Sequence, residues 1–157
     1  MIPKETLSEA ASNINNWLPN YIGLPYKHLG ITRDGIDCFN LCHLVYKEQL
    51  DVIIPYTTQD TTCSLDVDWY NQLETQTILI DRASAKWGWK IVEKPEIFDI
   101  VVMSIGATNT PNHCGMYLGY NKLLQTMEGH SSWVSTYGTP LKQYTVRIVR
   151  WNGSNIT

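Results

Sequence analysis

Apolar residues recur along the first part of the chain at the spacing of a helix. From Leu7 to Leu18 they return every three or four positions, which predicts a first helix. Thr6 or Ser8 is expected to cap its start, because a hydroxyl side chain can accept from the unpaired N–H groups there. Pro19 is expected to end it.

A second helix is predicted after a loop rich in glycine and proline. The loop runs from Gly23 to Gly35. The helix is expected from Asp37 to Leu50, because its apolar residues fall at positions i, i+3, i+4 and i+7. This apolar face consists of Cys38, Leu41, Cys42 and Val45. A cysteine thus lies in the first turn of the predicted helix.

The middle of the chain repeats the helical spacing less regularly. Leu73, Thr77 and Ile80 are three or four positions apart. This spacing predicts a third helix from about Asp66 to Lys86. The first half of the chain is therefore predicted to be mainly helical.

The pattern changes after Trp89. Residues 91–104, 113–127 and 143–151 are rich in β-branched and aromatic residues, which favours strands. Residues 119–122, Gly-Tyr-Asn-Lys, are typical of a tight turn and predict a hairpin. Helices followed by strands, without alternation, predict an α+β fold.

The composition fits one globular domain spanning residues 1–157, with 43% apolar and 17% charged residues. The net charge of −3 gives no basic face for nucleic acid. No apolar run is long enough to cross a bilayer, and the first residues lack the pattern of a signal peptide. We therefore expect a protein made in the cytoplasm with its four cysteines reduced.

Cys38 is a candidate nucleophile. The free N–H groups and the dipole at a helix N-terminus stabilise a thiolate. Cys42 and Cys63 are expected to be small core residues, as free cysteines often are. For Cys38 the spacing alone leaves both a catalytic and a core role open.

His113 is the candidate base for this thiol. It begins a predicted strand after a loop rich in Gly, Asn and Pro, a position that can face a helix N-terminus. Gln125 falls on the next strand of the hairpin, where its side-chain oxygen can accept from the imidazole. His28 and His130 are expected to be solvated, and His43 to point around the helix away from Cys38.

A zinc site is the alternative use of these cysteines and histidines. The candidate set is Cys38, Cys42, His43, Cys63, His113 and Cys114. Their spacing lacks the close Cys-x-x-Cys pairs of structural zinc sites. His113 and Cys114 are adjacent on a strand and therefore point to opposite faces. We predict no metal.

Three stretches resemble the NlpC family of papain-like cell-wall peptidases. Residues 21–50, YIGLPYKHLGITRDGIDCFNLCHLVYKEQL, resemble the family's cysteine motif and are most similar to its phage tail-associated branch. Residues 89–103, WKIVEKPEIFDIVVM, resemble the strand before the histidine. Residues 112–129, NHCGMYLGYNKLLQTMEG, resemble the histidine strand and its hairpin. The resemblance implies a papain-like fold, with the cysteine helix packed on an antiparallel sheet.

The resemblance also implies roles for individual residues. The catalytic residues it implies are Cys38 as nucleophile, His113 as base and Gln125 as the residue that orients the base. The substrate-binding residues are Asp37, Tyr26 and Phe39. The backbone N–H of the cysteine is the expected oxyanion donor. Tyr26 has loop packing as its alternative role, and Asp37 has helix capping.

The sequence departs from the family's pattern in three places, one of them a pair of residues. Phe39 and Asn40 occupy the place of a small Ser-Gly pair, Phe98 that of a glycine, and Gln125 that of the commonest third residue, histidine. A neutral amide stabilises an imidazolium less than a carboxylate does. These departures bear on the substrate pocket and on turnover rather than on the fold.

The function implied is a peptidoglycan-degrading cysteine endopeptidase or amidase of a bacteriophage tail, cleaving stem peptides between D-γ-glutamate and the diamino acid. Its partners would be the stem peptide and the tail-tip proteins of the virion, and it would need no metal or organic cofactor. One alternative is a non-catalytic structural tail-tip protein that keeps the fold as a plug or docking module. A lipid acyltransferase of the same superfamily is less favoured, because no membrane-binding segment is visible.

Overall fold

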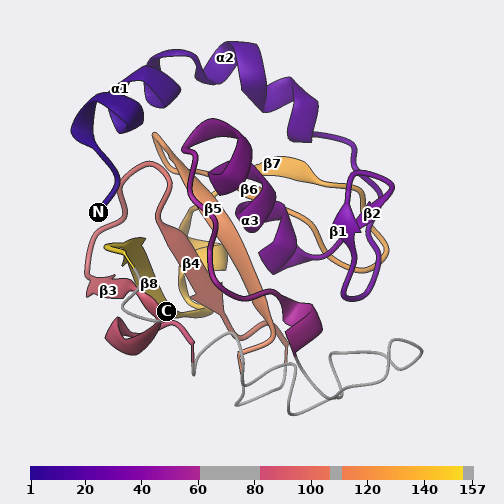
Figure 1. Cartoon of the computed structure of the whole chain (residues 1–157). Helices are drawn as coiled ribbons and strands as arrows, with labels where there is room; N and C mark the ends of the chain where they lie inside the picture. Colours follow the sequence, from indigo (N-terminus) through magenta and orange to yellow (C-terminus); the bar gives the residue numbers. More distant parts are fainter. Residues whose placement is uncertain (61–81, 107–110, 154–157) are drawn as a thin grey trace.

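The structure is a computed structural model that describes residues 1–60, 82–106 and 111–153. Helix α3 (Cys38–Gln49) lies across one face of an antiparallel sheet, and α1 (Lys4–Ser12) and α2 (Ile14–Trp17) arch over one end of the molecule (Figure 1). The sheet's strands are β3 (Trp89–Val92), β4 (Ile100–Met103), β5 (His113–Gly119), β6 (Lys122–Gln125), β7 (Trp133–Thr136) and β8 (Thr145–Trp151). Within the described ranges their order is β3-β8-β4-β5-β6-β7. The predicted α+β fold is confirmed.

The N-terminal helix is shorter than predicted. It ends at Ser12, and after Asn13 the chain continues as α2 and then as the 3-10 helix η1 (Leu18–Tyr21). The expected cap at Thr6 or Ser8 is wrong, because Pro3 holds the cap position and makes no side-chain capping bond. Pro19 does not end the helical path, since it lies in the first turn of η1, where its missing N–H costs nothing.

Helix α3 is confirmed almost to the residue. Leu41, Cys42 and Val45 are fully buried in the core between α3 and the sheet. Residues 61–81, which hold most of the predicted third helix, lie outside the described residues. At the described end of that segment, Ala85–Trp87 form the 3-10 helix η4, closed by Gly88 with a φ of 101°. The α-helix expected up to Lys86 is therefore wrong at this end.

Side chains on both faces of the sheet are buried. Val102 and Cys114 are paired across β4 and β5 and face the α3 layer, whereas Val101 belongs to a second core on the opposite face. Leu141 of the short helix α5 (Thr139–Lys142) packs against that second core. In the described ranges no helix has both the length and the hydropathy needed to cross a bilayer.

The predicted hairpin between β5 and β6 is confirmed. Tyr120 and Asn121 both have positive φ, 50° and 57°, as the two central residues of a type I′ turn require. This turn fixes the register of β6 against β5, with Leu124 opposite Met116. Strand β7, which pairs with β6, was not predicted.

Phe98 shows why a glycine is expected at its position. Its φ is 77°, in the left-handed region that costs a residue with a Cβ about 1–2 kcal/mol. The packing of the ring offsets this cost, because the side chain is buried and stacks on Trp17 with ring centroids 6.0 Å apart. Its backbone is held from two sides: the N–H donates to the carbonyl of Tyr117, and the carbonyl accepts from the hydroxyl of Tyr46. Phenylalanine in the place of glycine therefore adds a packed ring and leaves the course of the backbone unchanged.

Candidate active site

A two-stranded hairpin delivers the chain to the start of α3. Its strands, β1 (Ile31–Thr32) and β2 (Gly35–Ile36), lie inside the segment predicted as a loop. Gly30 is needed at its base, because a Cβ there would lie 2.3 Å from the carbonyl oxygen of Gly35. The carbonyl of Gly30 in turn accepts from the N–H of Asp37, 3.2 Å away. This close approach fixes the residue before the helix.

Asp37 caps α3. One carboxylate oxygen accepts from the N–H of Asn40 at 2.7 Å, and the other accepts from the hydroxyl of Thr58 in η2 (Thr58–Asp60). Burial, and to a lesser extent the charge of Cys38, raise the pKa of Asp37 well above its usual value. Of its two proposed roles, the structure therefore shows capping, and its contact with a substrate stays a prediction.

Phe39 and Asn40 are both built into the protein interior. The Phe39 ring stacks on Tyr56, with centroids 5.1 Å apart and planes at 4°. The Asn40 amide donates to the carbonyl of Gly30 at 2.9 Å and to Thr58 at 2.8 Å. The larger pair therefore fills space and ties η2 to the start of α3.

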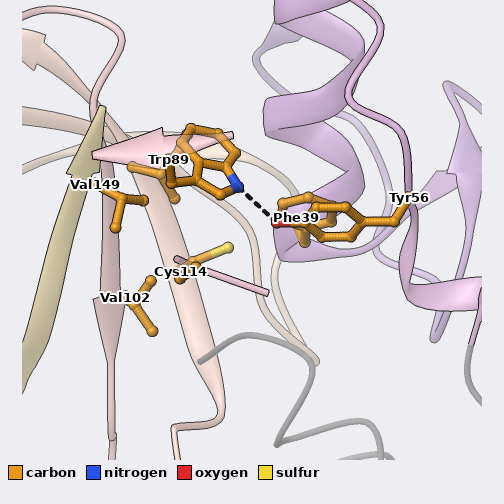
Figure 2. Close-up of a pocket in the computed structure, with 8 residues that line it drawn as sticks. Phe39, Tyr56, Trp89, Val102, Cys114 and Val149 are labelled. Atoms are coloured by element: carbon orange, nitrogen blue, oxygen red, sulfur yellow. Dashed lines mark hydrogen bonds between the residues drawn. The ribbon is translucent and has the colours of Figure 1, made fainter. Parts of the chain in front are cut away.

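A small apolar cavity of about 10 Å³ lies beside Phe39, between α3 and the sheet (Figure 2). Cys114 borders it from β5, and the hydrogen bond from the Trp89 indole to the Tyr56 hydroxyl, 2.8 Å long, crosses its upper side. A cavity of this size holds about one water molecule. Phe39, implied to contact the substrate, thus lies in the core in this structure.

Tyr26 contacts the short strand that leads to the nucleophile. It forms a bridge with Ile36, two residues before Cys38, and packs half-buried against the main core. This position agrees with loop packing, and its contact with the substrate stays a prediction.

Cys38 is the first residue of α3 and is 1% exposed. A hydrogen bond with the side chain of Cys114 is the largest effect on the pKa of Cys38, and it lowers this pKa. Burial raises the pKa, and His113 lowers it further. The net result is a pKa well below that of a free cysteine. The same contacts with Cys38 and Cys42, together with burial, raise the pKa of Cys114. Of these two contacting thiols, Cys38 is the one whose ionised form the surroundings favour.

His113 and Gln125 meet as predicted. Nε2 of His113 lies 2.8 Å from Oε1 of Gln125, and both residues are buried. Because an amide oxygen only accepts, this nitrogen carries the proton. The other ring nitrogen, Nδ1, is buried without a hydrogen-bond partner. Its lone pair is the one available to take a proton from a thiol.

The remaining histidines lie in other settings. His43 is part-buried and its ring contacts the carbonyl of Ile54 at 2.9 Å. His130 is exposed, as predicted, and its ring packs against Trp133. The prediction that His28 is solvated is wrong, since its ring nitrogens are buried. In the part of the chain that the structure describes, no three His, Cys, Asp or Glu side chains are grouped to hold a metal ion.

Two residues of this site were not singled out as such from the sequence. Cys114 was considered only as a zinc ligand, although its pairing with Val102 places it in the layer under α3. Ser135 accepts from Nε2 of Gln125 at 2.6 Å and lies on the unpredicted strand β7. The alternation of β5 is a signal that indicates Cys114, whereas Ser135 has no comparable signal.

One family model and several solved structures match this chain. The model of the NlpC/P60 family matches residues 23–150. Among solved structures, the NlpC/p60 domain of the peptidoglycan hydrolase SagA is 18% identical with a TM-score of 0.54, and the match covers 89% of this chain and 97% of that one. NlpC2 from Trichomonas vaginalis is 17% identical with a TM-score of 0.59, covering 90% and 47%.

A third solved structure, the peptidoglycan hydrolase RipB from Mycobacterium tuberculosis, is 15% identical with a TM-score of 0.55, covering 94% of this chain and 67% of that one. Comparison with curated protein sequences gives no significant match. At these identities the solved structures establish the papain-like fold. The chain spans nearly all of the SagA domain but about half the length of NlpC2.

Proposed function

The chain belongs to the NlpC/P60 family, and we propose that it is a cysteine peptidase that cleaves amide bonds in the stem peptides of peptidoglycan. The observation that carries the proposal is the buried pair of His113 and Gln125 beside a thiol of lowered pKa at a helix N-terminus. The names of SagA and RipB, both peptidoglycan hydrolases, support the substrate class.

The chemistry follows from the positions of the side chains. Nδ1 of His113 takes the proton of Cys38, and the thiolate attacks the carbonyl carbon of the amide. The N–H of Cys38, at the first position of α3, stabilises the oxyanion. The imidazolium then gives its proton to the leaving amine, and water attacks the thioester to release the acid and restore the thiol. No metal or cofactor takes part in these steps.

We further propose that the scissile bond joins D-γ-glutamate to the diamino acid, as the resemblance to the family implies. The phage-tail context is proposed on the sequence of the cysteine helix, where the aromatic Phe39 follows the nucleophile. In that context the protein would be made in the host cytoplasm, assemble with tail-tip proteins and act from the virion.

One observation favours the alternative of a non-catalytic tail-tip module that keeps the fold. Cys38 is 1% exposed and His113 is fully buried. The thiol must therefore become exposed before it can react with a substrate or a reagent, whereas a structural plug needs no such change. The enzymatic proposal is preferred because a structural role gives no reason for an unpartnered nitrogen of a buried imidazole beside an acidified thiol.

Mass spectrometry of purified stem peptides and whole peptidoglycan tests the proposal. The wild-type protein is expected to release a fragment that ends in glutamate, and Cys38→Ala is expected to release none. Cys42→Ala is the matched control, because it removes a buried thiol one turn further along the same helix and should leave cleavage intact. If a folded wild-type protein releases no new fragment, the non-catalytic structural module becomes the favoured function.

A further inference from the structure

Three buried thiols meet where the start of α3 packs on β5. Cys38 and Cys42 lie one turn apart on the helix, and Cys114 points from the strand towards this helix (Figure 2). All three are free cysteines, and none is more than 1% exposed. The proposed cleavage forms its covalent bond through Cys38 alone, so two further sulfurs lie beside the nucleophile without a chemical step of their own.

The hydrogen bonds distinguish one pair among these thiols. The thiol of Cys42 donates back along the helix to the carbonyl of Cys38, with the sulfur 3.5 Å from the oxygen. The thiol of Cys114 is hydrogen-bonded to the sulfur of Cys38 and also contacts Cys42. The contact with Cys38 raises the pKa of Cys114 and lowers that of Cys38. A thiolate and a thiol whose sulfurs are in contact are the partners from which a disulfide forms.

We propose that Cys38 and Cys114 form a redox switch, in which hydrogen peroxide oxidises the pair to a disulfide and a dithiol reductant restores both thiols. In the first step the thiolate of Cys38 attacks one peroxide oxygen, which forms a sulfenic acid on Cys38 and releases hydroxide. In the second step the sulfur of Cys114 attacks the sulfur of Cys38. The S–S bond forms, and the hydroxyl group leaves with the proton of Cys114 as water. The two thiols lose two electrons in total, and the peroxide is reduced to two molecules of water.

The burial of the pair favours the disulfide over further oxidation. Cys38 must become exposed to meet peroxide, as it must to meet a substrate. When the site closes again, the oxidised sulfur lies against Cys114 and away from a second peroxide molecule. The cavity beside Cys114 has space for about one water molecule, which is the product of the second step.

The disulfide removes the nucleophile and therefore stops cleavage. This effect rests on the proposed function, whereas formation of the bond does not. A low-pKa thiol beside a second thiol is also the arrangement found in redox-sensing cysteines. Exposure to peroxide should thus inactivate the protein reversibly rather than permanently.

Disulfide mapping of the full chain tests the switch without any substrate. The reduced protein is treated with hydrogen peroxide, its remaining free thiols are alkylated, and its peptides are analysed by mass spectrometry without reduction. The wild type is expected to lose two hydrogen atoms in mass and to yield one cross-link, between Cys38 and Cys114, which dithiothreitol separates. Cys42→Val is the matched control, because it removes the third thiol of the cluster and should yield the same cross-link.

Cys114→Ser separates the hydrogen bond from the disulfide, because serine keeps a donor beside Cys38 and cannot form an S–S bond. After peroxide, Cys38 in this variant is expected to advance to the sulfinic acid, which dithiothreitol does not reduce. Cleavage of the stem peptide should then recover in the wild type and stay lost in the variant. If Cys114→Ser does not fold, Cys114→Val replaces it, because valine is apolar and similar in size to cysteine.

The outcomes separate the two proposals. A reversible cross-link between Cys38 and Cys114, with no cleavage by the reduced protein, keeps the redox pair and rejects the peptidase function. Cleavage by the reduced wild type, with no cross-link after peroxide or with one through Cys42 or Cys63 instead, overturns the switch. Equal recovery of the wild type and Cys114→Ser would also overturn it, because Cys114 would then not be the partner that protects Cys38.

Discussion

The nucleophile and the base stand on two sides of the site that are built in different ways. On the nucleophile side, Asp37, Phe39 and Asn40 are fixed by capping and by close packing against Tyr56 and Thr58. The base side, by contrast, consists of hydrogen bonds that link side chains of neighbouring strands. A change in size should therefore damage the first side, and a change in donors or acceptors the second.

The departures from the family's pattern follow the same division. Phe39 and Asn40 replace small residues, and the surroundings of the helix accommodate them by stacking and by two amide hydrogen bonds. Gln125 replaces a ring by an amide, and this amide donates to the hydroxyl of Ser135. The nucleophile side thus accommodates its substitutions mainly by packing, and the base side accommodates its substitution by hydrogen bonding.

The largest effect on stability is expected from Phe39→Ser, which restores a small residue on the nucleophile side. The ring is 5% exposed and stacked, so its loss should lower the free energy of unfolding by about 3–5 kcal/mol. Urea denaturation measures this change. Phe39→Leu, which keeps most of the apolar volume, should cost about 1 kcal/mol. Equal and small costs for both would show that packing does not hold this side together.

A smaller effect, on the thiol rather than on the fold, is expected from Cys114→Val. Valine has a similar size but no donor, so the pKa of Cys38 should rise when the contact with the Cys114 thiol is lost. The pH dependence of Cys38 alkylation should then move to higher pH, with stability almost unchanged. Cys42→Val is the control that should leave the profile in place. An unchanged profile in Cys114→Val would leave His113 as the source of the low pKa.

The smallest effect is expected from Asp37→Asn, and it depends on pH. Because burial raises the pKa of Asp37 above its usual 3.8, the folded state favours the protonated form. The stability that this carboxyl contributes is fully present below its unfolded pKa and is lost as pH rises through the folded value. Asparagine keeps an acceptor for the cap and cannot ionise. Relative to the wild type, the variant should therefore gain stability from about pH 4 upward.

Urea denaturation at a series of pH values measures this trend. A constant difference between Asp37→Asn and the wild type would show that Asp37 ionises at no cost in the folded protein. If the wild type instead becomes more stable relative to Asp37→Asn as pH rises, the charged carboxylate stabilises the cap.

The sequence predicted the parts of the site that depend on local geometry. The helix with Cys38 in its first turn follows from periodicity over twelve residues. The contact between His113 and Gln125 follows from a hairpin whose turn fixes the register of its two strands. In both cases the relevant residues are joined by a short and regular stretch of chain.

The parts that were missed depend on long-range register. Ser135 reaches Gln125 because β7 pairs with β6 after an irregular connection, whose length does not determine the register. Thr58 reaches Asp37 by way of a 3-10 turn with no periodic signal. Cys114 lies against Cys38 because α3 packs on β5, a tertiary contact that neither segment specifies alone.

Alkylation of Cys38 tests most directly whether this residue is an activated nucleophile. The native protein is treated with iodoacetamide over a range of pH, and the modified cysteines are identified by mass spectrometry. Cys38 should react faster than the other three cysteines, with a midpoint below that of free cysteine. Equal, slow reaction of all four thiols in the folded protein would contradict the claim and leave the fold as a structural module.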